Sequence, residues 1–139
     1  MQAAVPLFDV ARALEPLRAE AVALFDRLTQ SGAFTLGQEL AAFEHRFASF
    51  CGSEHCVGVS DGTAALRLGL LALGLQPGQR VLTVPNTFVA TVEAIAAAGG
   101  EPVFVDVDPA TRCMDPGKLS AALAGDIAAV IPVHLYGHM

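Results

Sequence analysis

The sequence predicts an α/β protein with a mostly parallel sheet between helices. Two observations lead to this class. From Cys56 onward, short apolar runs alternate with helical segments, which is the pattern of strands joined by crossover helices. The runs are also apolar almost continuously, as expected for strands that are covered on both faces.

The composition limits the kinds of function. The chain has 139 residues, of which 53% are hydrophobic and 16% charged, enough for a domain with a sizeable core. Its formal net charge of −6 argues against a general nucleic-acid binder. No apolar run approaches the roughly 20 residues that a membrane-spanning helix needs. Residues 1–12 lack the basic start and continuous apolar stretch of a secretory signal, so we expect a cytoplasmic protein.

The cysteines indicate neither a disulfide framework nor a metal centre. There are three, Cys51, Cys56 and Cys113, in a pattern unlike that of small disulfide-rich domains. Cys51, His55 and Cys56 are close in sequence, and a metal is conceivable there. Their spacing lacks the paired C-x-x-C units of a structural zinc site, so reduced thiols are favoured and no metal is expected.

Two helices are expected before Cys56. Apolar residues at steps of three and four predict a helix over residues 14–28, with Pro16 in its first turn and Ser31-Gly32 at its end. A second helix is expected from about Gln38 to Phe50, followed by Gly52 as a left-handed C-terminal cap. We therefore divide the chain into an N-terminal helical arm, residues 1–30, and an α/β portion, residues 31–139.

The α/β portion is expected to hold four strands and three helices. Asp115-Pro116 has the chemistry of an N-cap followed by a first-turn proline, and Gly99-Gly100 is a helix stop. The strands are expected at 56–59, 80–84, 102–105 and 127–133, and the helices at 63–73, 88–98 and 116–124. The last strand is apolar almost throughout, and no helix follows it. Because such an edge is an aggregation hazard, we expect the chain to be cut short or completed by another chain.

The turn Ser60-Asp61-Gly62-Thr63 has two interpretations. A strand that turns on a glycine into a helix exposes backbone N–H groups at the positive end of the helix dipole, which suits a phosphate or carboxylate. The alternative is an ordinary capped helix, since Ser60 and Asp61 are both good N-cap residues. The charge of Asp61 would repel a phosphate, so this side chain is expected to face away or to cap the helix.

A series of motifs carries a family resemblance from about Ser31 to the last residue. In order, the motifs are Phe43-Glu44 with Phe47-Ala48, Gly62-Thr63-Ala64-Ala65-Leu66, Leu75-Gln76-Pro77-Gly78, Pro85-Asn86-Thr87-Phe88-Val89-Ala90-Thr91, residues 102–108 and residues 131–137. The chain resembles the N-terminal part of the pyridoxal-phosphate-dependent sugar aminotransferases, the DegT/DnrJ/EryC1/StrS family. The resemblance implies part of the large domain of the fold-type I enzymes, which has a mostly parallel seven-stranded sheet.

The resemblance also assigns the cofactor residues. The backbone amides of Gly62, Thr63 and Ala64 would bind the phosphate of pyridoxal 5'-phosphate, with the Thr63 hydroxyl as a further donor. Phe88 would stack on the pyridine ring, since the site needs a flat apolar face there. The alternative for Phe88, a core phenylalanine at a helix start, is favoured by burial statistics alone, and the motif context reverses that preference.

Three further residues are candidates on the substrate side. Asn86 follows the end of one strand, and His134 and Tyr136 follow the end of another, at the edge where open α/β sheets bind ligands. A histidine there could serve acid–base chemistry, although a simply exposed histidine is the favoured reading. Asp106 and Asp108 look like a catalytic pair, but with Pro109 behind them they favour a turn.

The residue that carries the family's chemistry is missing from this sequence. Transamination needs a lysine that forms a Schiff base with the cofactor, and in the family it lies beyond the point where this chain ends. Lys118 is the only lysine, and as a solvated helix residue it does not substitute. The implied parent function is amino transfer from glutamate to a keto group of a nucleotide-activated sugar, by a homodimer with active sites at its interface.

Two other functions stay open at this point. The chain could belong to a dehydratase or a regulatory homologue that keeps the cofactor site for another use. It could also be a non-catalytic interaction module that binds no cofactor.

Overall fold

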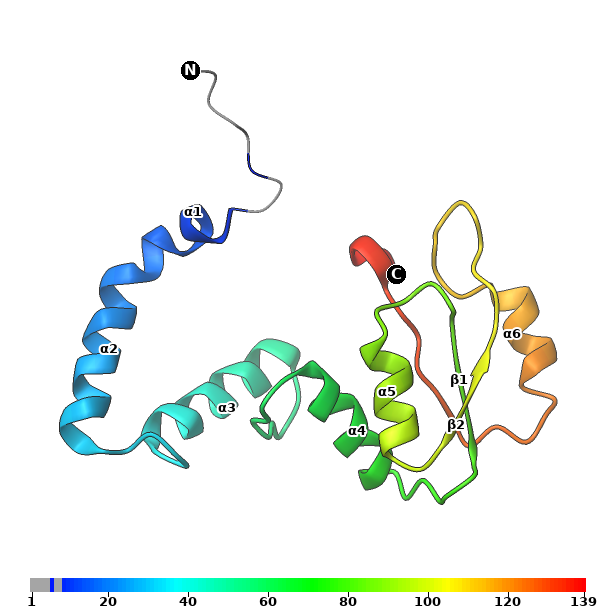
Figure 1. The fold of residues 1–139 in the computed structure, drawn as a ribbon, viewed down its shortest axis with the longest axis horizontal. Coiled ribbons are helices and arrows are strands. Elements are labelled where there is room, and N and C mark those ends of the chain that lie inside the picture. The colour runs from blue at the N-terminus through cyan, green and yellow to red at the C-terminus, as the bar shows by residue number, and fades with distance from the viewer. Residues whose placement is uncertain (1–5, 7–8) are drawn as a thin grey trace. The chain divides into compact units, whose positions relative to one another are not determined.

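The computed structural model describes Pro6 and residues 9–139, which form two compact units divided after Gly58. The predicted N-terminal arm comprises residues 1–30, and seven of these, residues 1–5, 7 and 8, lie outside the described residues. The division of the chain at residue 30 stays a prediction. Figure 1 shows the elements of both units in chain order.

The first unit is helical. Helix α1 (Val10–Leu14), a 3₁₀ turn η1 (Glu15–Leu17) and α2 (Arg18–Ser31) follow one another, and Pro16 lies at the start of the 3₁₀ turn. Gly32 ends α2 with φ 69°, and Gly52 ends α3 (Gln38–Cys51) with φ 66°. Both glycines adopt the left-handed conformation that other residues adopt only at a cost. The two predicted helices are therefore confirmed.

The predicted strand at 56–59 is wrong. These residues lie outside the sheet, and the amide of Gly58 donates instead to Glu44 Oε1 at 2.7 Å, a side chain of α3. A short apolar run becomes a strand only where a neighbouring strand pairs with it, and the described residues supply no such neighbour.

The second unit contains a three-stranded parallel sheet in the order β2-β1-β3. Strand β1 (Arg80–Thr83) is central, with β2 (Glu101–Phe104) and β3 (Ala129–Val130) on its two sides. Helices α4 (Gly62–Ala72) and α5 (Ala90–Ala97) precede and follow β1. Helix α6 (Pro116–Ala122) and a second 3₁₀ turn η2 (Leu135–Gly137) complete the unit. The predicted fold class is confirmed.

Alternate residues of β1 build the two halves of the core. Val81 packs with Leu70 of α4 and Ile95 of α5, whereas Leu82 belongs to the cluster against which Leu119 of α6 packs. Because successive side chains of a strand point to opposite faces, α4 and α5 cover one face of the sheet and α6 the other. Figure 1 shows α5 and α6 on either side of the strands.

Strand β3 is much shorter than the predicted 127–133. Its pairing with β1 extends through the bonds Ala128 N–H to Arg80 O and Ile131 N–H to Leu82 O, at 2.9 and 2.8 Å. Among the described residues no backbone hydrogen bond to β1 follows the one from Ile131, and the pairing ends there. Among the described strands β3 has one neighbour, and its residues alternate between half-buried and exposed. The expectation of a strand buried on both faces is wrong for this structure.

Candidate functional site

The start of α4 is capped by the protein itself. Asp61 is the N-cap, and its Oδ1 accepts the amide of Ala64 at 2.8 Å, while Ser60 Oγ donates to its Oδ2 at 3.0 Å. The hydrogen bond from the Ala64 amide, and after it that from Ser60, lower the pKa of Asp61. The capped-helix interpretation of this turn is therefore confirmed, and the anion seat stays a prediction.

The first residues of α4 keep an open backbone. A Cβ built on Gly62 would meet nothing within 4 Å, so a ligand can approach the turn closely. Of the three residues predicted to bind phosphate, Gly62 can offer its amide without displacing a contact of Asp61, whereas the Thr63 amide makes a minor hydrogen bond to that carboxylate. Ala64 can offer its amide only if the Asp61 side chain rotates away.

The first turn of α4 lies at the carboxyl edge of the sheet. One groove brings Ala65 and Leu66 together with Ile131 and Pro132, and a second brings Gly74 and Leu75 together with Ala128. Helix α4 therefore runs antiparallel to β3, with its start beside the carboxyl end of that strand. This is the edge at which α/β sheets bind ligands.

Phe88 lies at the same edge, in the loop between β1 and α5. The loop bends at Pro85, Asn86 and Thr87, and Asn86 is exposed. The Phe88 side chain is also exposed, with 75% of its surface accessible. The alternative of a core phenylalanine is therefore wrong, and the ring offers the free aromatic face that stacking needs.

His134 and Tyr136 follow β3, so they also lie at the carboxyl edge. Both are exposed, and His134 Nδ1 lies 3.1 Å from the carbonyl oxygen of His138. Cys113 Sγ donates to that same carbonyl at 3.4 Å. Tyr136 adopts φ 59°, a left-handed conformation that is rare for a residue with a large side chain.

The predicted site residues thus share an edge of the sheet rather than a set of contacts. No hydrogen bond joins Thr63, Phe88 and His134 to one another within the described part of the chain. The parallel order of β1 and β3 places the loops that follow them side by side.

Lys118 is held as a protonated ion-pair partner. Its Nζ lies 2.9 Å from Asp106 Oδ2 and 3.7 Å from Asp115 Oδ2. The hydrogen bond with Asp106 raises the pKa of Lys118, and the same bond lowers the pKa of Asp106. A nucleophilic amine needs a lowered pKa, so the prediction that Lys118 does not replace the family's lysine is supported by its surroundings.

The Asp106–Asp108 pair builds a turn, as expected. Asp108 Oδ1 accepts the amides of Ala110 and Thr111 at 2.8 and 2.9 Å. The hydrogen bond from Thr111, and after it that from Ala110, lower the pKa of Asp108. Asp115 accepts the amides of Gly117 and Lys118 as the predicted cap of α6.

Two threonine contacts were missed in the sequence. Thr83 Oγ1 donates to the carbonyl of Ile131 at 3.0 Å, and the hydroxyls of Thr87 and Thr91 lie 2.9 Å apart. The spacing of four residues between Thr87 and Thr91, at the start of a predicted helix, is the signal that could have revealed the second contact.

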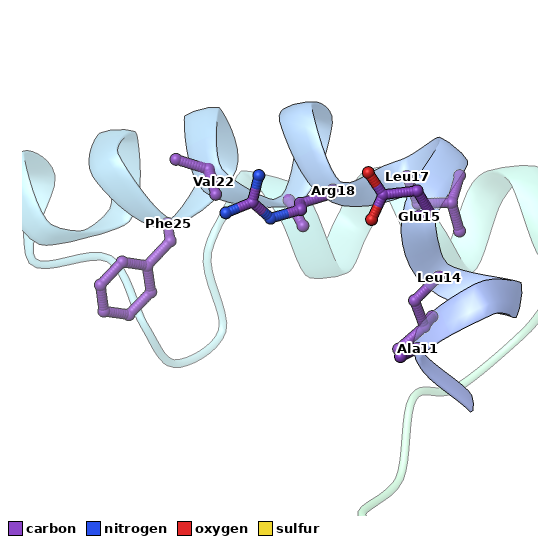
Figure 2. A pocket seen from close by; sticks show the side chains of 8 residues that line it. Ala11, Leu14, Glu15, Leu17, Arg18, Val22 and Phe25 are labelled. Atoms are coloured by element: carbon purple, nitrogen blue, oxygen red, sulfur yellow. The ribbon is translucent and has the colours of Figure 1, made fainter. Parts of the chain in front are cut away.

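A separate apolar groove of about 550 Å³ lies on the helices of the first unit. Figure 2 shows its lining side chains, which come from α1, η1 and α2. Most are hydrocarbon, among them Leu14, Leu17, Val22 and Phe25, with Glu15 and Arg18 as the charged members. It contains none of the predicted cofactor residues and is not a phosphate site.

Two other kinds of feature are absent from the described residues. Within Pro6 and residues 9–139, no three His, Cys, Asp or Glu side chains are grouped to hold a metal ion. No described helix is long and apolar enough to cross a membrane.

The fold and the site define a class: a parallel α/β unit whose carboxyl edge presents a capped helix start and an exposed aromatic ring. The model of the DegT/DnrJ/EryC1/StrS aminotransferase family matches residues 16–139. The chain belongs to this family.

Curated relatives are similar over nearly the whole chain. It is 41% identical over 134 residues to a dTDP-3-amino-3,4,6-trideoxy-alpha-D-glucose transaminase of Streptomyces venezuelae, covering 96% of this chain and 35% of the relative. It is 39% identical over 135 residues to a "pleiotropic regulatory protein" of Geobacillus stearothermophilus, covering 97% and 36%. The chain thus spans about a third of the length of these relatives.

Solved structures share the fold. The crystal structure of S. venezuelae DesV in complex with a ketimine intermediate matches with a TM-score of 0.92 at 41% identity, covering 97% of this chain and 36% of that one. The structure of NtdA from Bacillus subtilis with bound cofactor PMP matches with a TM-score of 0.88 at 37% identity, covering 99% and 32%. Relatives in this family therefore bind a pyridoxal-type cofactor.

The residues of this chain fit the phosphate and the aromatic ring of such a cofactor. The open backbone at Gly62 and the amide donors of the α4 start suit a phosphate, and exposed Phe88 suits an aromatic ring. The ion-paired Lys118 does not suit covalent attachment. The residues present therefore suit non-covalent binding of the cofactor, but they do not supply the amine that reacts with it.

Proposed function

We propose that this chain forms the phosphate seat and the ring-stacking face of a pyridoxal-phosphate enzyme that transfers an amino group to a keto group of a nucleotide-activated sugar. The observation that carries the proposal is the shared edge of the sheet. The start of α4 and Phe88 both lie at its carboxyl end, in a chain of an aminotransferase family. The bound cofactor would supply the electron sink for amino transfer.

The chain's own residues would bind and orient the cofactor. The amides of Gly62 and Thr63 would donate to the phosphate, with the Thr63 hydroxyl and the Ala64 amide joining when Asp61 turns away. Phe88 would cover one face of the ring. Asn86, His134 and Tyr136 are proposed to face the substrate, because they leave the same sheet edge.

The substrate class is proposed from the family. The transaminase of S. venezuelae is named for a dTDP-amino sugar, which supports a nucleotide sugar as acceptor here. Glutamate as amino donor follows from the family resemblance. Because Lys118 is ion-paired, the chain by itself is proposed to bind the cofactor without catalysing the transfer.

Cofactor binding to the 139-residue chain tests the proposal. We expect equilibrium dialysis to show saturable binding of pyridoxal 5'-phosphate, and Phe88→Ala to weaken it by about two- to tenfold, the size of one aromatic stack. The matched control is Phe50→Ala, since Phe50 is also highly exposed but lies on α3, and it should bind like the parent chain.

Two outcomes would count against the proposal. One is the absence of saturable binding, and the other is an equal loss of affinity in both variants. Borohydride treatment followed by mass spectrometry is expected to leave the cofactor unattached. A reduced adduct on Lys118 would show that the chain carries its own reactive amine.

A regulatory function is the second candidate. It is favoured by the 39% identity to the Geobacillus stearothermophilus protein, which is named as a pleiotropic regulator. Both candidates would bind the cofactor. They differ in whether a complete protein containing this chain converts glutamate and a nucleotide keto-sugar to 2-oxoglutarate and an amino sugar, which a coupled assay measures directly.

A further inference from the structure

A hydroxyl pair connects the β1–α5 loop to the first turn of α5. Thr87 Oγ1 and Thr91 Oγ1 lie 2.9 Å apart, Thr87 being half-buried in the loop and Thr91 only 6% exposed in the helix. Either hydroxyl can donate to the other. The predicted cofactor site leaves this pair without a function.

The two partners differ in how firmly they are held. Thr91 lies in α5, which packs on the sheet through Ala94 and Ile95. Thr87 lies in a loop that bends at three successive residues. A hydrogen bond from a packed helix to a bent loop restricts the loop, because the helix cannot follow the loop's motion.

Phe88 depends on this restriction. The residue is 75% exposed, so packing contributes little to the orientation of its side chain. Its carbonyl accepts the amide of Thr91 at 3.1 Å, and the N-cap of α5, Val89, makes no side-chain capping bond. The Thr87–Thr91 pair is therefore the side-chain anchor on the loop that presents Phe88, within the described residues.

We propose that Thr91 is a positioning residue, which acts through the hydroxyl of Thr87 to fix the loop that presents Phe88. The part of the proposal that concerns cofactor stacking rests on the proposed function. The part that concerns the loop does not, since it follows from the hydrogen bond between Thr87 and Thr91.

The experiment uses the 139-residue chain and five variants. Thr91→Val removes the buried hydroxyl while keeping the shape of the side chain, and Thr87→Val does the same for the partner hydroxyl. Thr91→Ser and Thr87→Ser each keep a hydroxyl at the substituted position. The matched control is Thr83→Val, which removes a fully buried hydroxyl with its own hydrogen bond, to Ile131. It therefore reports the general cost of losing a buried hydroxyl in this unit.

The first readout needs no ligand. In ¹⁵N relaxation measurements, we expect the order parameters of residues 86–89 to fall from about 0.85 toward about 0.6 in both valine variants. They should recover in the serine variants and stay unchanged in Thr83→Val. Unchanged order parameters in Thr91→Val and Thr87→Val would overturn the proposal, whatever the chain binds.

The second readout is binding of pyridoxal 5'-phosphate. We expect Thr91→Val to weaken binding by about two- to tenfold, the range of one lost hydrogen bond, and to reduce the upfield shift that the Phe88 ring causes at the cofactor's ring proton. A parent chain that does not bind the cofactor would overturn the proposed function. The relaxation measurement would still show whether Thr91 restricts the loop that presents Phe88. A parent chain that binds, with Thr91→Val binding equally well, would overturn the positioning role.

Discussion

At the scale of single residues, Asp61 decides how the α4 start can be used. Its carboxylate accepts the Ala64 amide at 2.8 Å, the kind of donor that a phosphate would seek. Because its pKa is lowered, the carboxylate is charged at neutral pH. Its capping contribution is fully present above the ordinary value of 3.8 and is lost as the pH falls through the lowered value.

Replacing Asp61 by asparagine should improve phosphate binding. Asparagine caps helices about as well as aspartate does, so α4 should remain intact, while one negative charge beside the ligand is removed. We expect the affinity for inorganic phosphate and for pyridoxal 5'-phosphate to rise about fivefold, the effect of one nearby charge in water. Calorimetric titration of the parent chain and the variant checks this.

The control is Asp126→Asn, which changes the net charge equally at an exposed residue after α6. It should leave both affinities unchanged. If Asp61→Asn bound no better than Asp126→Asn, the carboxylate would not be a competitor for this seat.

At the scale of elements, the close approach of the α5–β2 turn fixes the position of β2. Gly99 ends α5 with φ 85°. A Cβ on Gly100 would lie 3.0 Å from Leu75 Cδ2 and 3.2 Å from the carbonyl oxygen of Gln79. The Gln79 carbonyl cannot move freely, because it accepts the amide of Glu101 at 2.8 Å.

Two glycine-to-alanine substitutions should therefore have opposite effects on the free energy of unfolding. Gly100→Ala is expected to destabilise the chain by about 1–3 kcal/mol through overpacking. Gly69→Ala, inside α4 where a Cβ would meet nothing within 4 Å, should stabilise it by about 0.5–1 kcal/mol. Urea denaturation measures both, and an equal effect of the two would refute the close packing at Gly100.

At the scale of the whole molecule, the exposed apolar face of α2 bears on self-association. Val22 and Phe25 line the groove of Figure 2, and Phe25 is 64% exposed. Large exposed apolar patches usually mark an interface. Because the family resemblance implies a homodimer, we propose a second copy of the chain as the partner of this face.

A charge placed on that face should separate the copies. If the chain self-associates through this face, Phe25→Asp is expected to lower its sedimentation coefficient to that of a monomer, because a carboxylate buried without a partner is costly. Leu36→Asp is the matched control, since Leu36 is an exposed leucine in the α2–α3 connection. A Phe25→Asp chain that sediments like Leu36→Asp would exclude this face as the interface.

The sequence by itself determined the helices, the central strand and the motifs. Helix α3 was expected at 38–50 and runs from Gln38 to Cys51, and α6 begins behind its predicted cap Asp115. Such features depend on residues close in sequence, namely side-chain caps, left-handed glycines and apolar residues at steps of three and four. The stacking role of Phe88 is predicted from its motif alone, since nothing in its local pattern requires it.

Only the tertiary structure decided which strands form and which groups at the site are already paired. The apolar run at 56–59 is not a strand and β3 is cut to Ala129–Val130, because a strand exists only where another strand accepts its hydrogen bonds. The ion pair of Lys118 with Asp106 and the Thr87–Thr91 contact likewise depend on where the folded chain places each partner. Residues close in sequence determine whether a segment can form a helix or a strand. Whether a strand or a side-chain contact forms depends on the residues that folding brings beside it.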